Sequence, residues 1–321
     1  MTMRKILLIS LLCWTAPGWS QDYPTRPVRI VVAFAPGAST DILAREVAYR
    51  LTGSQGKSFL VENRAAGAGG TVGTAYVAKS PPDGYTLLMA NSSTHTIAPH
   101  VYKNVEYDPI KDFSPISLVA WIPFFLSVNA ALPARDVKSF IEHARGKPGQ
   151  LHFSSSGSGT SPHLAGELFK SMAKIDIVHV PYKGTGAALG DLVSGVVQFS
   201  FLSGPAAVPF VSKQQLRILG VTTLKRSSLF PDVPTISEAG VPGYEMPNWV
   251  GLMAPARTPA PIISRLNNDI TSWMGEADTK KKMLALGVDA AGGPPAFFAE
   301  AIVKGHAQAG KLIETSGIKI E

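Results

Sequence analysis

One repeated pattern constrains the fold of this chain most: a short apolar run, then a loop of small polar residues, then an amphipathic segment. In the first unit, residues 28–34 form a nearly continuous apolar run, residues 35–40 interrupt it, and Leu43, Val47 and Leu51 recur at helical spacing. Such an apolar run is typical of a strand that helices cover on both faces. Further strands are predicted at residues 86–90, 151–153, 177–180, 198–202 and 216–222. The alternation predicts an α/β fold with ligand-binding loops at the carboxyl ends of the strands.

The chain is also expected to form two lobes, because 321 residues exceed what one compact core usually holds. Residues 113–127 form a long apolar stretch interrupted by Pro115 and Pro123, which we interpret as a strand that crosses between the lobes. Residues 220–226 are interpreted as the return. The predicted boundaries are residues 21–123 and 225–321 for lobe 1 and residues 124–224 for lobe 2.

The first 20 residues have the layout of a secretory signal peptide. Arg4 and Lys5 precede an apolar run at residues 6–14, and small residues lead to a predicted cleavage site between Ser20 and Gln21. The alternative of a membrane anchor is disfavoured, because a spanning helix needs roughly 20 apolar residues. We therefore expect an exported protein located in the periplasm.

Cleavage would remove the single cysteine of the chain. A lipoprotein signal at Cys13 is disfavoured, because Leu12 stands where such signals carry a small residue. Without Cys13 the mature chain has no thiol nucleophile, no cysteine-bound metal and no disulfide, which suits a large periplasmic protein. Loss of Arg4 and Lys5 lowers the net charge from +7 to +5. This diffuse positive charge is compatible with a small anionic ligand and does not indicate a nucleic-acid partner.

Four strand-to-helix loops rich in Gly, Ser, Thr or Asn carry the candidate chemistry. Free backbone N–H groups at helix N-termini favour a carboxylate or phosphate, and glycines let a ligand approach the main chain. The alternative is that Ser39, Ser92, Thr160 and Thr185 only cap helices. Taken as a set, the loops predict a polar pocket for a small anion.

Sharper motifs are incomplete, so neither a cofactor nor a metal is predicted. Residues 53–58 end like a phosphate-binding loop, but Leu51 replaces its first glycine. Residues 67–73 resemble a dinucleotide fingerprint, but Val72 replaces its third glycine. No histidine pairs convincingly with another ligand at metal-binding spacing.

Three side chains near the loops have two readings each. His163 is placed to touch a ligand, or else to cap or pack. Asp41 could orient the first loop or bind a ligand amine, although its position at a helix start is also explained by the helix dipole. Lys183 could pair with a carboxylate or be an ordinary exposed lysine.

Motifs in order along the mature chain carry a family resemblance. They lie at residues 23–27, 35–41, 61–64, 67–70, 82–88, 180–184, 231–235, 238–243 and 249–252. The chain resembles the Bug family, the periplasmic receptors of tripartite tricarboxylate transporters.

The resemblance implies a two-lobed periplasmic binding-protein fold, in which each lobe is a mainly parallel sheet flanked by helices and a ligand cleft separates the lobes. It implies a monomeric receptor, not an enzyme, that captures a small organic carboxylate and delivers it to the large and small membrane subunits of a transporter. One alternative is a receptor that presents its ligand to a sensor kinase. Another is a secreted α/β hydrolase, which is disfavoured because the sequence shows no nucleophile–base pairing.

The predicted ligand-binding residues come from this resemblance and from the loops. They are Phe34, Ala35, Gly37, Ala38, Ser39, Asp41, Ser92, Ser155, Gly157, Ser158, Gly159, Thr160, His163, Lys183 and Ser203. Two of them depart from the family pattern: Ala38 replaces a usual glycine, and Ser203 lies where many members carry an acidic or amide residue. The second departure favours plain carboxylates over amino acids, because a ligand amine loses one partner.

Overall fold

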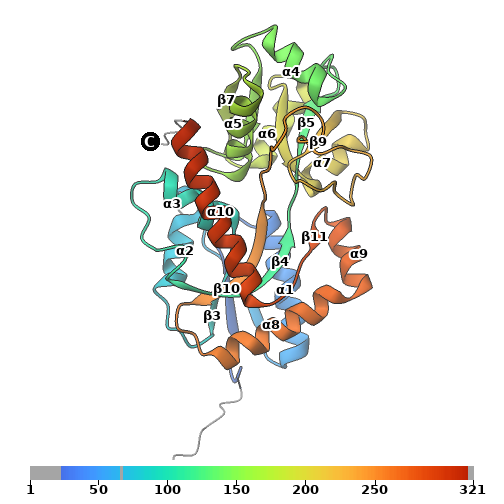
Figure 1. Cartoon of the computed structure of the whole chain (residues 1–321). Helices are drawn as coiled ribbons and strands as arrows, with labels where there is room; N and C mark the ends of the chain where they lie inside the picture. Colours follow the sequence, from blue (N-terminus) through green and yellow to red (C-terminus); the bar gives the residue numbers. More distant parts are fainter. Residues whose placement is uncertain (1–22, 66–67, 317–321) are drawn as a thin grey trace, which may run out of the picture.

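A computed structural model describes residues 23–65 and 68–316 of the chain. The predicted signal peptide and its cleavage site lie outside the described residues. The described part forms two lobes, each built around one β-sheet flanked by helices (Figure 1). This confirms the predicted two-lobed α/β architecture.

The sheet of lobe 1 has six strands in the order β11-β4-β10-β3-β1-β2. Strand β1 pairs in parallel with β2 and β3, whereas β10 runs antiparallel to β3 and β4, and β11 antiparallel to β4. The strands are β1 (Val28–Val32), β2 (Phe59–Asn63), β3 (Thr86–Asn91), β4 (Phe113–Trp121), β10 (Trp249–Pro255) and β11 (Asp289–Ala290).

The sheet of lobe 2 has five strands in the order β7-β6-β8-β5-β9. Strand β6 is parallel to β7 and β8, and β5 is antiparallel to β8 and β9. The strands are β5 (Phe124–Asn129), β6 (His152–Ser155), β7 (Val178–Pro181), β8 (Phe199–Ser203) and β9 (Leu216–Val221).

Both sheets are therefore mixed, where a mainly parallel arrangement was predicted. Helical crossovers within a lobe produce parallel neighbours. The chain also passes directly from β4 in lobe 1 to β5 in lobe 2, and returns from β9 to β10. These passages insert β5 and β10 against the direction of their neighbours. The chain does cross between the sheets within residues 113–127, but through two strands, β4 and β5, rather than the single strand predicted; the exact lobe boundaries stay a prediction.

Helices cover both faces of the sheet in lobe 1. Ile30 and Val32 of β1 pack in one apolar cluster and Val31 in another, because successive side chains of a strand point to opposite faces.

The helical elements are α1 (Ser39–Gln55), η1 (Ala68–Gly70), α2 (Thr71–Ala78), η2 (Ser93–Ile97), α3 (Ala98–Val101), α4 (Val137–Arg145), α5 (Ser161–Ala173), α6 (Thr185–Ser194), α7 (Gly204–Val211), α8 (Ala260–Gly275), α9 (Ala277–Ala285) and α10 (Pro295–Ser316).

Helix α10 connects the lobes. Phe298 and Ile302 in its first half pack in a cluster of lobe 1, whereas Ala309 and Ile313 belong to the cluster that contains the core of lobe 2. Figure 1 shows α10 running along both lobes. Among the described residues, none of the helices is both long and apolar enough to span a membrane.

Candidate ligand-binding site

The first predicted loop joins β1 to α1 and is accessible at its tip. Ala35 and Gly37 are exposed, while Ala38 and Ser39 are half-buried. Gly37 has φ +85°, a conformation that favours glycine. Ala38 is the N-cap of α1 and has no side-chain oxygen, so it cannot cap the helix. The first backbone N–H groups of α1 are therefore left without a side-chain cap from the N-cap residue.

Phe34 and Asp41 shape this loop from within. The carbonyl of Phe34 accepts a hydrogen bond from the Asn63 side chain at 3.0 Å. The Asp41 carboxylate accepts from the Gly37 N–H at 2.9 Å, from Asn63 at 2.9 Å and from two Arg45 nitrogens at 3.0 and 3.1 Å. Burial alone would raise the pKa of Asp41, but these hydrogen bonds outweigh it and lower the pKa. The carboxylate is thus ionised and occupied, which supports the role of orienting the loop.

Ser92 lies at the end of β3 and is buried. Its hydroxyl accepts a hydrogen bond from the Trp249 N–H of β10 at 2.9 Å. The adjacent Asn91 side chain donates to the Thr40 hydroxyl in α1 at 3.2 Å. The structure therefore brings this loop next to the first one, but it gives the Ser92 hydroxyl a partner inside the protein.

The Ser/Gly loop between β6 and α5 is braced by its own hydrogen bonds. The Ser155 hydroxyl accepts from the Gly157 N–H at 3.1 Å, and the Thr160 hydroxyl donates to the Gly157 carbonyl at 2.7 Å. Gly159, with φ +74°, is buried and donates its N–H to His163 Nδ1 at 3.1 Å. Gly157, Ser158 and Thr160 are half-buried. The Gly159 amide is consequently satisfied by the protein rather than free.

A stacked histidine pair supports this loop, and its second member was missed in the sequence. The rings of His163 and His179 lie 3.9 Å apart between centroids, and His179 also packs on Phe153. Burial lowers the pKa of His163 to about 4, and burial together with His163 lowers that of His179 to about 3. Both rings are neutral near pH 7. The sequence places His179 within the strand predicted at residues 177–180. Its position beside Phe153 of β6 depends on the pairing of the two strands in the structure.

Ser155 and His179 lie at the distance of a nucleophile and a base. Ser155 Oγ is 2.7 Å from His179 Nε2. Ser155 is 1% exposed, however, and its oxygen also accepts the Gly157 N–H. In this structure the hydroxyl is bonded to its own loop and to His179, so the pair braces the Ser/Gly loop against β7.

Lys183 and Ser203 lie at two helix starts on either side of α5, because β6 lies between β7 and β8 in the sheet. Lys183 is exposed in the loop before α6, whose N-cap is Gly184, and the half-buried Ser203 is the N-cap of α7. Helices α5, α6 and α7 all follow strands of one sheet and have no side-chain cap. By contrast, Asp136 caps α4 by accepting the Ser139 N–H at 2.8 Å. Lobe 2 thus presents three uncapped helix N-termini at one edge of its sheet.

The loops of the two lobes meet at the junction. Ser93 Oγ lies 3.0 Å from Ser161 Oγ at the start of α5, and the Tyr102 hydroxyl donates to the Ser158 carbonyl at 3.0 Å. The loops before α1 and after β3 are therefore on the same side of the junction as the Ser/Gly loop. Among the described residues, no cluster of three His, Cys, Asp or Glu side chains could hold a metal ion.

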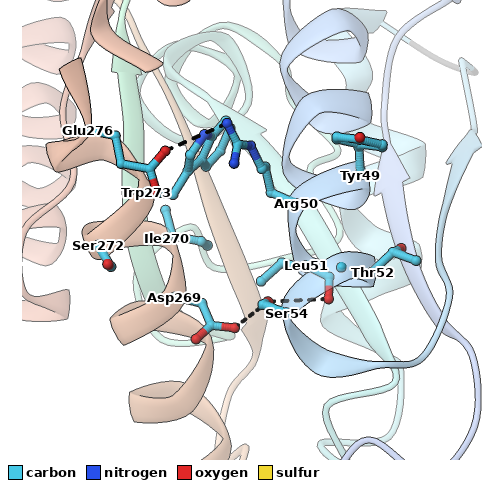
Figure 2. A pocket seen from close by; sticks show the side chains of 11 residues that line it. Tyr49, Arg50, Leu51, Thr52, Ser54, Asp269, Ile270, Ser272, Trp273 and Glu276 are labelled. Carbon is cyan, nitrogen blue, oxygen red and sulfur yellow. Dashed lines mark hydrogen bonds and ion pairs between the residues drawn. The ribbon is translucent and has the colours of Figure 1, made fainter. Parts of the chain in front are cut away.

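A cavity of about 520 Å³ lies elsewhere, between α1 and α8 of lobe 1. Figure 2 shows two pairs of polar side chains that link the helices across it: Ser54 donates to Asp269 at 2.6 Å, and Arg50 lies 3.7 Å from Glu276. None of the predicted ligand-binding residues lines this cavity. These pairs link α1 to α8 and to the residue that follows α8, so they stabilise the packing of the two helices.

A two-lobed α/β chain with one sheet in each lobe has the fold of the periplasmic binding proteins. R. palustris Rpa4515 with adipate superimposes with a TM-score of 0.87 at 38% identity, covering 93% of this chain and 99% of that chain. MatC (Rpa3494) from Rhodopseudomonas palustris, with bound malate, has a TM-score of 0.80 at 30% identity and covers 91% of this chain and 100% of that one.

Sequence comparison gives the family. Residues 43–318 match the family described as "Tripartite tricarboxylate transporter family receptor". Protein BugT of Bordetella pertussis is 38% identical over 79% of this chain and 78% of its own length. The chain belongs to the TctC, or Bug, family of periplasmic solute-binding receptors. The resemblance read from the sequence motifs is confirmed, and members of this family are substrate-binding receptors rather than enzymes.

Proposed function

We propose that this protein captures a small carboxylate, preferably an aliphatic dicarboxylate, between its lobes and delivers it to the membrane subunits of a tripartite transporter. One observation carries the proposal: α1, α5 and α6 begin without a cap from their own N-cap side chains, and hydrogen bonds link the loops around these helix starts at the lobe junction. Backbone N–H groups and helix dipoles there favour an anion. Two relatives of the same fold were solved with the dicarboxylates adipate and malate.

The proposed ligand contacts divide into two groups. The accessible tip of the first loop, the half-buried part of the Ser/Gly loop, Lys183 and Ser203 face the ligand. The other predicted residues position these groups, because the Asp41 carboxylate, the Ser92 and Ser155 hydroxyls, the Gly159 N–H and His163 Nδ1 already have partners. With the Asp41 carboxylate occupied, the first loop offers no free carboxylate to pair with a ligand ammonium group, which favours plain carboxylates over amino acids.

We further propose that the protein is exported as a monomer, with its signal peptide removed before Gln21. Intact mass of periplasmic protein tests this. A mass that retains residues 1–20, or lipid on Cys13, would contradict it.

The binding proposal is tested with a thermal-shift screen of mono-, di- and tricarboxylates, followed by calorimetry. We expect one molecule of a dicarboxylate per chain, without turnover. Ala38→Glu places a carboxylate at the start of α1 and should abolish the ligand-dependent shift. Ala296→Glu is the matched control, because Ala296 is exposed near the start of α10. Equal shifts in the two variants would exclude the first loop as a ligand contact.

A further inference from the structure

Two glycines from different lobes lie in direct backbone contact. Gly204 is the first residue of α7 in lobe 2, and Gly287 follows α9 in lobe 1; both are buried. An ideal Cβ on Gly204 would lie 2.5 Å from the Gly287 carbonyl oxygen and 2.7 Å from its Cα. A Cβ on Gly287 would lie 2.7 Å from the Gly204 Cα. Only glycine at both positions permits this approach.

The contact joins two oppositely polarised helix ends. Gly287 has φ +72°, and its N–H donates to the Leu284 carbonyl at 2.8 Å. This left-handed glycine with its hydrogen bond terminates α9. The N-terminus of α7 carries partial positive charge and the C-terminus of α9 partial negative charge, so the two ends attract each other. Figure 1 shows α7 above α9 and β11 on one side of the molecule.

A second contact between the lobes lies on the other side. The Tyr102 hydroxyl, just after α3, donates to the Ser158 carbonyl before α5. In Figure 1, α3 and α5 lie on the side opposite α7 and α9. The lobes thus touch on both sides of the loops that form the candidate site.

We propose that the contact between Gly204 and Gly287 sets how far the lobes close, so that these glycines determine ligand affinity without touching the ligand. This inference rests on the proposed function of a receptor that closes on a small carboxylate. A side chain at Gly287 holds the lobes apart at α7 and lengthens the hydrogen bonds from lobe 2 to the ligand.

Gly287→Ala tests the proposal against a matched control, Gly56→Ala. Gly56 also ends a helix with positive φ, at +67°, but its ideal Cβ would meet nothing within 4 Å. Both variants carry a similar backbone strain, and only the first adds a collision between the lobes. We expect Gly56→Ala to keep the parental affinity for adipate and Gly287→Ala to lose at least about tenfold. X-ray scattering should show a smaller contraction on adipate binding for Gly287→Ala. Equal affinity and equal contraction would overturn the proposal.

A second test needs no ligand. In protein that begins at Gln21, the pair Gly204→Cys and Gly287→Cys supplies the only two thiols. Copper–phenanthroline should oxidise them rapidly to a disulfide, since the roughly 4 Å that a disulfide places between Cβ atoms needs only a slight separation of the lobes. The control pair, Gly56→Cys with Gly204→Cys, should stay reduced. Cross-linking no faster than this control would overturn the proposal. Rapid cross-linking in protein that binds no carboxylate would confirm the contact between the lobes and contradict the proposed function, and with it the role of the contact in ligand affinity.

Discussion

Replacing Asp41 with asparagine tests whether the first loop is held from within. The carboxylate is 3% exposed and accepts four hydrogen bonds, and an asparagine turns an NH₂ group toward some of the same donors. A hydrogen bond to a charged group contributes about 1.5–3 kcal/mol. Arg45 is half exposed, so solvent screens part of its contribution. We expect the free energy of unfolding to fall by about 2–3 kcal/mol. Ligand affinity should fall by a larger proportion than stability, because the Gly37 N–H loses its carboxylate acceptor.

The assay is urea denaturation of the parent, Asp41→Asn and a control, Asp83→Asn. Asp83 forms an ion pair with Arg26 at 3.1 Å, but both side chains are well exposed, so its replacement should cost about 0–1 kcal/mol. The lowered pKa of Asp41 also predicts the pH dependence: its contribution is present above the ordinary pKa of an aspartate and is lost as the pH falls through the lower pKa of the fold. Equal costs for the two variants, or parental ligand affinity in Asp41→Asn, would refute the reasoning.

Three further predictions concern the Ser/Gly loop and its supports. Tyr102→Phe removes the hydrogen bond to Ser158, worth about 0.5–1.5 kcal/mol, and should weaken adipate binding roughly 2- to 13-fold in calorimetry with the melting temperature little changed. Gly166→Ala drives a methyl group into the ring of Phe153 and should destabilise the fold by about 1–3 kcal/mol. Gly190→Ala, in open space on α6, should stabilise the fold slightly. Because burial, and secondarily a neighbouring histidine, lowers the pKa of His179 to about 3, the unfolded chain binds a proton that the fold excludes below pH 6.5. Parental stability should therefore fall as the pH drops, and His179→Gln should flatten that slope in denaturation curves.

The strands that could be predicted are those that form continuous apolar runs. Residues 28–34 contain β1, and residues 113–127 contain β4 and the first four residues of β5, because burial on both faces demands such runs. Strand β10 was missed, although it lies between β3 and β4 and is buried throughout. Gly251 and Pro255 interrupt its pattern, and its neighbours lie far away in the sequence. Partners that depend on distant chain segments leave no local signal.

The candidate site divides in the same way. Loop positions could be predicted, because glycines and hydroxyls at strand ends form a local pattern. The partner of each polar atom could not be predicted. Whether Asp41 orients the loop or binds a ligand amine is decided by its hydrogen bonds to Arg45 and Asn63, and Asn63 lies in β2. Ser92 likewise bonds to Trp249, which lies 157 residues further along the chain.

A crystal structure of the mature protein grown with adipate tests the central claim most directly. We predict one adipate at the lobe junction, with a carboxylate within hydrogen-bond distance of backbone N–H groups of the first loop and of the helix starts in lobe 2. Adipate bound in the cavity between α1 and α8, or at the junction with its carboxylates held only by side chains, would contradict the account.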